Sequence, residues 1–136
     1  MVGIVLISHG EMAKGMANSA TLFFGNNIPQ LEYCCLCAED APDDFGVKME
    51  EAIAKVDTGD GVLLLADLFG GTPCNQAMTR LGEKVDCIAG ANFPLFLELL
   101  NSREDGLNLE ELVETGKNGV ADVKVLLQTV DDEDED

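Results

Sequence analysis

Residues 3–12 read GIVLISHGEM, in which an apolar run leads into His9, the only histidine of the chain. Together with Val2 this run spans residues 2–7 before the polar residues begin. A short apolar run bounded by a turn signal is typical of a strand that is covered on both faces, as in a parallel sheet. Residues 31–37, 62–66 and 85–89 have the same character. The sequence therefore predicts four buried strands, and it places His9 just beyond the end of the first.

Apolar residues recur at helical spacing between these runs. Met12, Met16 and Ala20 follow one another at intervals of four residues, which predicts an amphipathic helix. Thr72 followed by Pro73 predicts the start of another helix, with Thr72 as N-cap and proline at the first helical position. The first helix should stop at Gly25, and the helix that begins at Thr72 should stop near Arg80 and Gly82.

Three further helices are expected. One follows Pro42 and has Met49, Ile53 and Val56 on one face. Another starts at residues 92–94 and covers residues 95–100, and the last starts at Asn108 with Leu109, Leu112 and Val113 on one face.

The order of these elements predicts the fold class. Strands that alternate with helices at short spacing form crossover units, which build a parallel sheet with helices on both faces. We expect an α/β protein with a single doubly wound, mainly parallel sheet of four parallel strands, to which residues 123–127 add a C-terminal edge strand. No linker or repeat interrupts the sequence, so residues 1–129 should form one domain and residues 130–136 a disordered acidic tail.

The charge of the chain limits its partners. The formal net charge is −18, and only eight Lys and Arg residues are scattered along the sequence. Nucleic acids and anionic membrane surfaces are therefore disfavoured as partners, because a few dispersed cations cannot follow a row of phosphates. The N-terminal run lacks the cationic start of a signal peptide, and no apolar stretch has the length of a membrane-spanning helix. We expect no direct membrane insertion.

The cysteines indicate a reducing compartment. There are five of them, an odd number without CxxC spacing, which argues against a disulfide framework and against a zinc site. No metal site is predicted, and the expected location is the cytoplasm. Cys34, Cys35 and Cys37 are expected to be small buried hydrophobic residues of a strand.

Two loops at predicted strand ends carry the residues with chemical potential. The first is SHGEM, residues 8–12, and the second is LADLFGGTPCNQ, residues 65–76. In the common doubly wound order the first and third strands are neighbours, so His9 and Asp67 should face each other at the carboxyl edge of the sheet, where ligands bind. A carboxylate that holds one ring nitrogen fixes the imidazole tautomer and leaves the other nitrogen free as a nucleophile.

The second loop also has the features of an anion site. Gly70 and Gly71 allow backbone N–H groups to approach an anion, and Thr72 adds a hydroxyl at a helix N-terminus, where the helix dipole favours negative charge. The lysine of a nucleotide-binding loop is absent, which suits a phosphoryl group that is held briefly and passed on. His9 is therefore a candidate covalent carrier, whereas Asn75 and Met12 are expected to serve packing or loop support.

Three segments resemble one protein family. GIVLISHGEMAKGMANSATLFFG, residues 3–25, is similar to the start of the mannose-type enzyme IIA domains of the bacterial phosphoenolpyruvate-dependent sugar phosphotransferase system. DLFGGTPCN, residues 67–75, resembles their second signature, and GANFPLFLELL, residues 90–100, a third segment. The likeness covers about residues 1–127; Leu68 and Phe69 and the acidic tail depart from the pattern.

The resemblance implies a role for each matching residue. His9 would be phosphorylated, Asp67 would be its partner, and Thr72 would bind the phosphoryl group, with Asn92 and Pro94 near the active face. The chain would be a phosphotransferase of sugar transport that works without a cofactor. It would accept the group from the phosphocarrier HPr and pass it to a histidine of the cognate IIB component. It would also form a homodimer through a C-terminal strand, here residues 123–127.

Other readings of the same residues remain open. A related relay that feeds dihydroxyacetone kinase shares the fold and the histidine, and a small-anion sensor would use the glycine loop without covalent chemistry. Histidine phosphatases and tetrapyrrole chelatases also have a histidine after a strand, but they need further arginine or histidine residues, and this chain has one histidine. A receiver domain would need an acidic pair after the first strand, which is missing.

Overall fold

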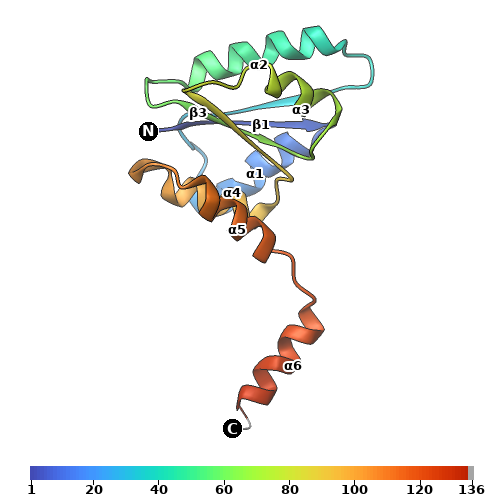
Figure 1. The fold of residues 1–136 in the computed structure, drawn as a ribbon, viewed down its shortest axis with the longest axis vertical. Coiled ribbons are helices and arrows are strands. Elements are labelled where there is room, and N and C mark those ends of the chain that lie inside the picture. The colour runs from blue at the N-terminus through green and yellow to red at the C-terminus, as the bar shows by residue number, and fades with distance from the viewer. Residues whose placement is uncertain (135–136) are drawn as a thin grey trace.

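The computed structural model describes the backbone of residues 1–134 and the side chains of residues 1–129. It contains one sheet of four parallel strands, in the order β2-β1-β3-β4 (Figure 1). The predicted fold class is thereby confirmed, including the position of the first strand between the second and the third. The strands are β1 (Gly3–His9), β2 (Leu31–Leu36), β3 (Val62–Ala66) and β4 (Val85–Ala89).

Helices cover both faces of this sheet (Figure 1). Figure 1 shows α2 and α3 on one side and α1, α4 and α5 on the other. Each helix follows a strand or another helix through a short connection, as the alternating sequence pattern predicts. The helices are α1 (Met12–Phe24), α2 (Pro42–Val56), α3 (Gly71–Met78), α4 (Phe93–Ser102) and α5 (Leu109–Asn118), with a short 3-10 helix at Arg103–Asp105.

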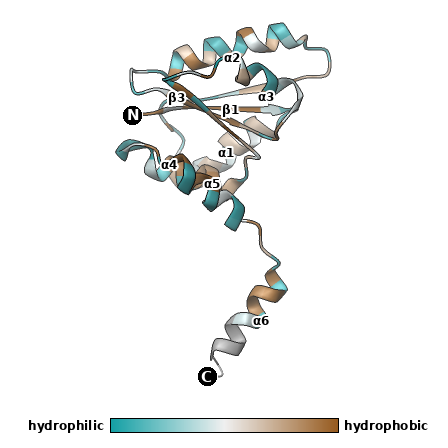
Figure 2. Cartoon of the chain, viewed as in Figure 1, coloured by the Kyte–Doolittle hydropathy of each residue, from teal (hydrophilic) through white to brown (hydrophobic). Residues whose placement is uncertain are grey.

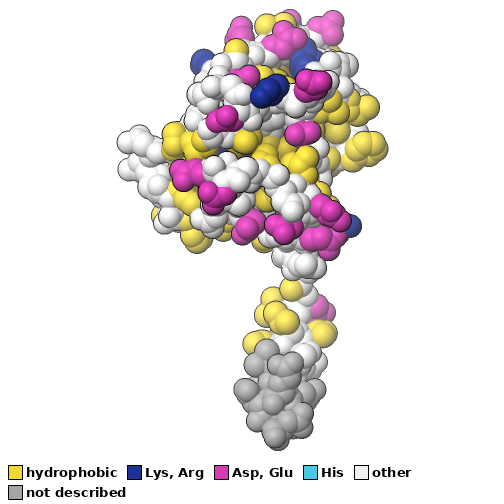
Figure 3. Space-filling model, turned by 60° about the vertical axis from the view of Figure 1, so that its left-hand side comes forward, with side chains coloured by type: hydrophobic (Ala, Val, Ile, Leu, Met, Phe, Trp, Pro, Cys, Tyr) yellow, Lys and Arg dark blue, Asp and Glu magenta, His cyan; other side chains and the backbone are white. Residues whose placement is uncertain are grey.

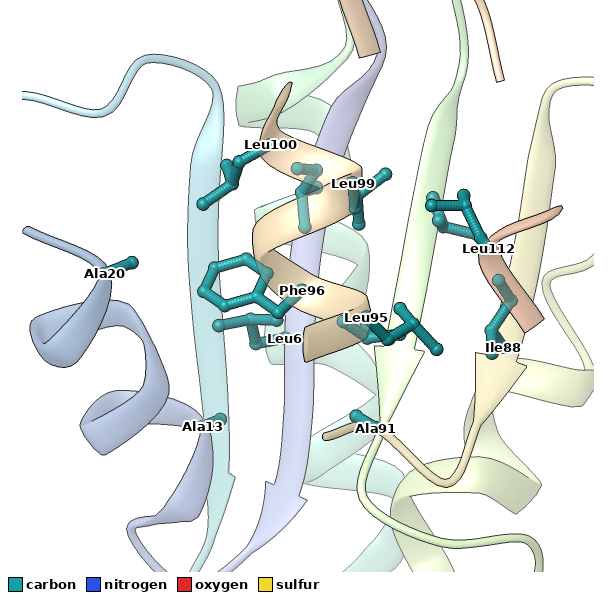
Figure 4. Packing of buried hydrophobic residues seen from close by; sticks show 13 residues of the cluster. Leu6, Ala13, Ala20, Ile88, Ala91, Leu95, Phe96, Leu99, Leu100 and Leu112 are labelled. Atoms are coloured by element: carbon teal, nitrogen blue, oxygen red, sulfur yellow. The ribbon is translucent and has the colours of Figure 1, made fainter. Parts of the chain in front are cut away.

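The two helical layers enclose two hydrophobic clusters because successive strand residues point to opposite faces. In β1, Ile4 and Leu6 belong to the cluster beneath α1, α4 and α5, whereas Val5 and Ile7 belong to the cluster beneath α2 and α3. Figure 4 shows the first cluster, in which Phe96 and neighbouring leucines of α4 lie over the sheet. The central strands β1 and β3 are correspondingly hydrophobic along most of their length (Figure 2). This double burial explains the uninterrupted apolar runs of β1 and β3. The expectation of full burial is wrong for β2 and β4, which lie at the edges of the sheet, are only partly buried and include Glu32 and Asp86.

The predicted helix starts are confirmed at α4 and α5 and corrected at α3. The side chain of Asn92 accepts a hydrogen bond from Leu95 N–H, and that of Asn108 from Glu111 N–H, each at 3.1 Å. The helix α3 instead starts at Gly71, with Gly70 at the N-cap, so the prediction of Thr72 as N-cap is wrong. Gly70 has a φ of +90°, a conformation that glycine adopts without strain, and the turn is therefore made before Thr72.

The C-terminal segment is also corrected. Residues 123–127 do not form an edge strand; they open the helix α6 (Val123–Asp134), which extends away from the body (Figure 1). A short apolar run fits a strand or a helix equally well, and here Asp122 caps a helix by accepting a hydrogen bond from Val125 N–H at 3.2 Å. The backbone of α6 reaches residue 134. Residues 135–136 of the predicted disordered tail lie outside the described residues, and its disorder stays a prediction.

The cysteines are free thiols in three kinds of environment. Cys34 and Cys74 are buried, Cys35 and Cys87 are half-buried, and Cys37 is exposed. The expectation of burial is therefore wrong for Cys37, because β2 ends at Leu36 and leaves the next residue in the loop. Within residues 1–134, no helix combines the length and the apolarity that crossing a membrane requires.

Candidate functional site

His9 and Asp67 meet because their strands are neighbours. His9 is the last residue of β1, and Asp67 directly follows β3. The backbone N–H of Asp67 donates to the carbonyl oxygen of Ile7 at 3.1 Å, so the pairing of the two strands continues one residue beyond β3. This continuation fixes Asp67 beside His9 at the carboxyl edge of the sheet, as the predicted strand order requires.

The carboxylate of Asp67 holds both the backbone and the ring of His9. Its Oδ2 accepts a hydrogen bond from the His9 backbone N–H at 2.9 Å and lies 2.8 Å from His9 Nδ1. Its Oδ1 accepts from Leu68 N–H at 2.9 Å. A carboxylate next to Nδ1 favours the tautomer that carries its proton there, so Nε2 keeps its lone pair. The Asp67 side chain is 9% exposed and that of His9 46% exposed, which leaves the ring accessible from solvent.

The other side of the imidazole rests against the start of α3. A Cβ atom placed on Gly71 would lie 2.8 Å from His9 Cε1 and 2.9 Å from His9 Nε2. Gly71 also has a φ of +77°, which strains any residue with a side chain. Gly70 has a φ of +90°, but open space surrounds its Cα. Gly71 is therefore required by contact and conformation together, and Gly70 by conformation alone.

The N-terminus of α3 is available to an anion next to Nε2. Among the described residues, no side chain caps this helix, so its first N–H groups are free to bind a negatively charged group. Thr72 is half-buried in the first turn. The structure thus brings His9, Asp67, Gly70, Gly71 and Thr72 into one region at the sheet edge, as predicted.

The residues that were expected to play lesser roles fall into two groups: two of them hold helices together, and two are exposed to solvent. Asn92 uses its whole amide to join helices, because it caps α4 and donates to the Gly116 carbonyl oxygen of α5 at 2.8 Å. Pro94 packs where a Cβ on Gly119 would lie 2.6 Å from its ring, so it also belongs to the α4–α5 contact. Asn75 is exposed on α3, and Met12 is 45% exposed at the start of α1.

Sequence reasoning left two features of the site without a role. Leu68 and Phe69 are 49% and 81% exposed in the loop between Asp67 and Gly70. An apolar pair inside a loop, directly before two glycines, is the signal that could have marked them as a contact surface. The second feature is the buried hydroxyl of Ser8, which is 1% exposed. A polar residue directly after the apolar run of residues 2–7 was the available signal.

The fold and the site together define a class: α/β proteins that present a carboxylate-bound histidine next to a helix N-terminus at the carboxyl edge of a parallel sheet. Comparison with known proteins identifies the family within this class. Residues 3–117 match the family model described as the PTS system fructose IIA component. The chain belongs to this family, the IIA components of the sugar phosphotransferase system (PTS).

Individual relatives agree with this assignment. The chain is 34% identical over 131 residues to the mannose-specific EIIAB component of Escherichia coli, covering 90% of this chain but only 40% of that protein. It is 30% identical to the fructose-specific EIIA component of Bacillus subtilis, covering 83% of this chain and 77% of the relative. Among solved structures, the PTS IIA protein associated with the fucose utilization operon from Streptococcus pneumoniae superposes with a TM-score of 0.85 at 31% identity, covering 93% of this chain and 99% of that one.

Proposed function

We propose that the chain is a phosphoryl carrier of a sugar phosphotransferase system. It accepts a phosphoryl group from phospho-HPr on His9 and passes it to a histidine of the cognate IIB component. The observation that carries this proposal is the position of the His9 ring, with Nδ1 2.8 Å from Asp67 Oδ2 and Nε2 over Gly71 at the start of α3. One nitrogen is thus held by a carboxylate, and the other faces a site for an anion.

In this proposal Nε2 is the atom that is phosphorylated, which is supported by the contact of Nδ1 with Asp67. The Nε2 lone pair attacks phosphorus while the bond between phosphorus and the donor breaks, and the electron pair of that bond leaves with the donor. The Nδ1 proton stays on the ring, which gains positive charge that the Asp67 carboxylate stabilises. The N–H groups at the start of α3 and the Thr72 hydroxyl receive the phosphoryl oxygens. Transfer to IIB is the same step in reverse with a different partner, so the carrier returns unchanged.

The family membership supports this relay at a coarser level, since PTS IIA components are subunits of sugar phosphotransferases. We place the carrier in the cytoplasm, where HPr and IIB would meet it. The transported sugar does not contact a carrier of this kind. The relatives' names, which include mannose and fructose, therefore do not determine the sugar for this chain.

We further propose that two copies of the chain associate through the segment at residues 123–127. Val123, Leu126 and Leu127 lie three and four residues apart on α6 and are 55–65% exposed. In the described part of the chain, α6 extends away from the body, so these side chains are available to a second copy (Figure 1). Burial of one such leucine contributes about 1.5–3 kcal/mol.

The proposal is tested by reconstituting the relay. Phosphoenolpyruvate, enzyme I and HPr should add one acid-labile phosphoryl group to the chain, which intact-mass spectrometry detects. His9→Ala should take up none, and Asp67→Asn should take it up at least ~10-fold more slowly because the ring loses its charged partner. Adding IIB should then remove the group from the chain.

Three other results would decide against parts of this proposal. No adduct under conditions that phosphorylate a control IIA component, with reversible phosphate binding that survives His9→Ala, would indicate an anion sensor. An adduct that passes to a dihydroxyacetone kinase subunit and not to IIB would indicate the alternative relay. A wild-type rate for Asp67→Asn would remove Asp67 from the mechanism.

A further inference from the structure

Ser8 is an unusual residue in the core of this protein. Among the residues whose side chains are described, only Ser8 and Arg103 are buried and polar, with 1% and 3% exposure. A buried hydroxyl has to be hydrogen-bonded, because an unsatisfied one costs about 1–3 kcal/mol. Ser8 directly precedes His9, so its hydrogen bonds bear on the position of the candidate nucleophile.

The hydroxyl of Ser8 makes two hydrogen bonds, both to backbone groups that follow His9 in the sequence. It accepts from the backbone N–H of Ala13 at 2.8 Å and donates to the carbonyl oxygen of Gly10 at 3.2 Å. Glu11, at the N-cap of α1, makes no capping hydrogen bond with its own side chain. Ser8 therefore supplies the cap of α1 from outside the helix, and it closes the backbone of residues 8–13 into a compact loop.

This loop is the part of the His9 environment that Asp67 does not reach. Asp67 holds the His9 backbone N–H and ring, and the Gly10 N–H donates to the Leu36 carbonyl oxygen of β2 at 2.8 Å. Gly10 then turns the chain with a φ of +58°. The Gly10 carbonyl oxygen and the first turn of α1 are fixed by Ser8 instead. The strands thus hold the chain as far as the Gly10 N–H, and Ser8 holds the Gly10 carbonyl oxygen and the start of α1.

We propose that Ser8 is a positioning residue for phosphoryl transfer. Its hydroxyl keeps the turn after His9 and the start of α1 in the conformation in which the ring lies against Asp67 and over Gly71. The inference rests on the proposed function for its effect on transfer, but the ring geometry that it predicts exists without phosphorylation. A shift of about 1 Å at a reacting group is enough to slow a reaction by an order of magnitude or more.

The test compares substitutions that differ in the hydroxyl. Ser8→Thr keeps the hydroxyl and should retain transfer, whereas Ser8→Ala should lower the rate of phosphorylation by phospho-HPr by ~10-fold. Ser8→Val has the shape of Ser8→Thr without its hydroxyl, so this pair carries the comparison if Ser8→Ala does not fold. Asn108→Ala is the matched control, because it removes one cap hydrogen bond from α5, away from His9.

A readout at the ring separates positioning from stability. His9 is the only histidine, so the ring nitrogens of the ¹⁵N-labelled chain give a single pair of signals, which report the populations of the two neutral tautomers. We expect Ser8→Ala and Ser8→Val to reduce the population that carries the proton on Nδ1, and Ser8→Thr and Asn108→Ala to leave it unchanged.

The ring signals decide the inference. Unchanged ring signals in Ser8→Ala or Ser8→Val would overturn it, and Ser8 would then be only a helix cap. A wild-type chain that takes up no phosphoryl group would overturn the proposed function, while the ring signals would still decide the role of Ser8. If the wild type is phosphorylated, a wild-type transfer rate in both hydroxyl-free variants would also overturn the inference.

Discussion

The imidazole of His9 lies between a carboxylate and a glycine, and the glycine leaves the ring no room to move toward α3. Gly71 Cα faces the Cε1 and Nε2 edge of the ring, so a methyl group there would occupy space that the ring already fills. At residue scale this contact is as specific as the hydrogen bond to Asp67. It explains why two consecutive glycines, both with positive φ, have different roles.

Gly71→Ala and Gly70→Ala form a matched pair. Each places a side chain at a positive φ, which should cost about 1–3 kcal/mol of unfolding free energy in a denaturant titration. Only Gly71→Ala also displaces the ring, so it should slow phosphorylation of His9 at least ~10-fold more than Gly70→Ala does. Equal transfer rates in the two variants would contradict a site in which the ring rests on Gly71.

At the scale of elements, much of the fold could be predicted because the central strands β1 and β3 are covered on both faces, and the edge strands β2 and β4 are partly buried and still mainly apolar. Such strands read as continuous apolar runs, and their order follows from the rules for crossover connections. The meeting of His9 and Asp67 is a consequence of that order, so it was accessible from the sequence. The secondary structure of residues 123–127 could not be predicted in this way, because a mainly apolar run of five residues is compatible with both a strand and a helix.

Two details of the site also lay beyond the sequence. The start of α3 depends on the backbone angles of Gly70 and Gly71, which no apolar pattern records. The hydrogen bonds of Ser8 depend on the closure of the loop between β1 and α1. Side-chain types and their order predict which residues meet at a sheet edge, but the contacts within a turn require coordinates.

The burial and the pKa of the cysteine thiols predict the order in which they react. Burial raises the pKa of the Cys34 and Cys87 thiols to about 11, and the nearby carboxylate of Asp40 raises the pKa of the exposed Cys37 thiol. Thiolates react with iodoacetamide, so labelling of the native chain should be slow at about pH 7 and faster at about pH 9. Cys37 should react first because it is exposed, and Cys34 should react only after unfolding.

Peptide mass spectrometry after timed labelling measures this order. Cys37→Ser should remove the earliest adduct and leave the later ones unchanged. Labelling of Cys34 as fast as Cys37 in the native chain would show that the contact between β2 and α2 opens, contrary to the burial of Cys34 in the cluster beneath α2.

At the scale of the whole molecule, the surface is strongly acidic. Figure 3 shows Asp and Glu side chains spread over the visible face, with few Lys and Arg side chains among them. This charge favours partners with basic surfaces and opposes close approach of two copies except where apolar side chains provide the contact. Among the described segments, the helix α6 extends furthest from the acidic body, and it carries the apolar side chains of the proposed contact (Figure 1).

The proposed dimer is tested by light scattering coupled to size-exclusion chromatography. The wild-type chain should elute with the mass of two copies, and Leu127→Glu should give the mass of one, because a charge replaces an apolar contact. Gln128→Glu adds the same charge to the neighbouring exposed position and should remain dimeric. A wild-type chain that stays monomeric over a broad concentration range would contradict the dimer.

The central claim is that His9 carries the phosphoryl group on Nε2 while Asp67 holds Nδ1. The most direct test is a long-range ¹H–¹⁵N correlation spectrum of the ¹⁵N-labelled chain before and after treatment with phosphoenolpyruvate, enzyme I and HPr. Because there is only one histidine, no assignment ambiguity arises. We predict that phosphorylation shifts the Nε2 signal and leaves the proton on Nδ1. Attachment of phosphorus to Nδ1, or an unchanged spectrum, would contradict the account.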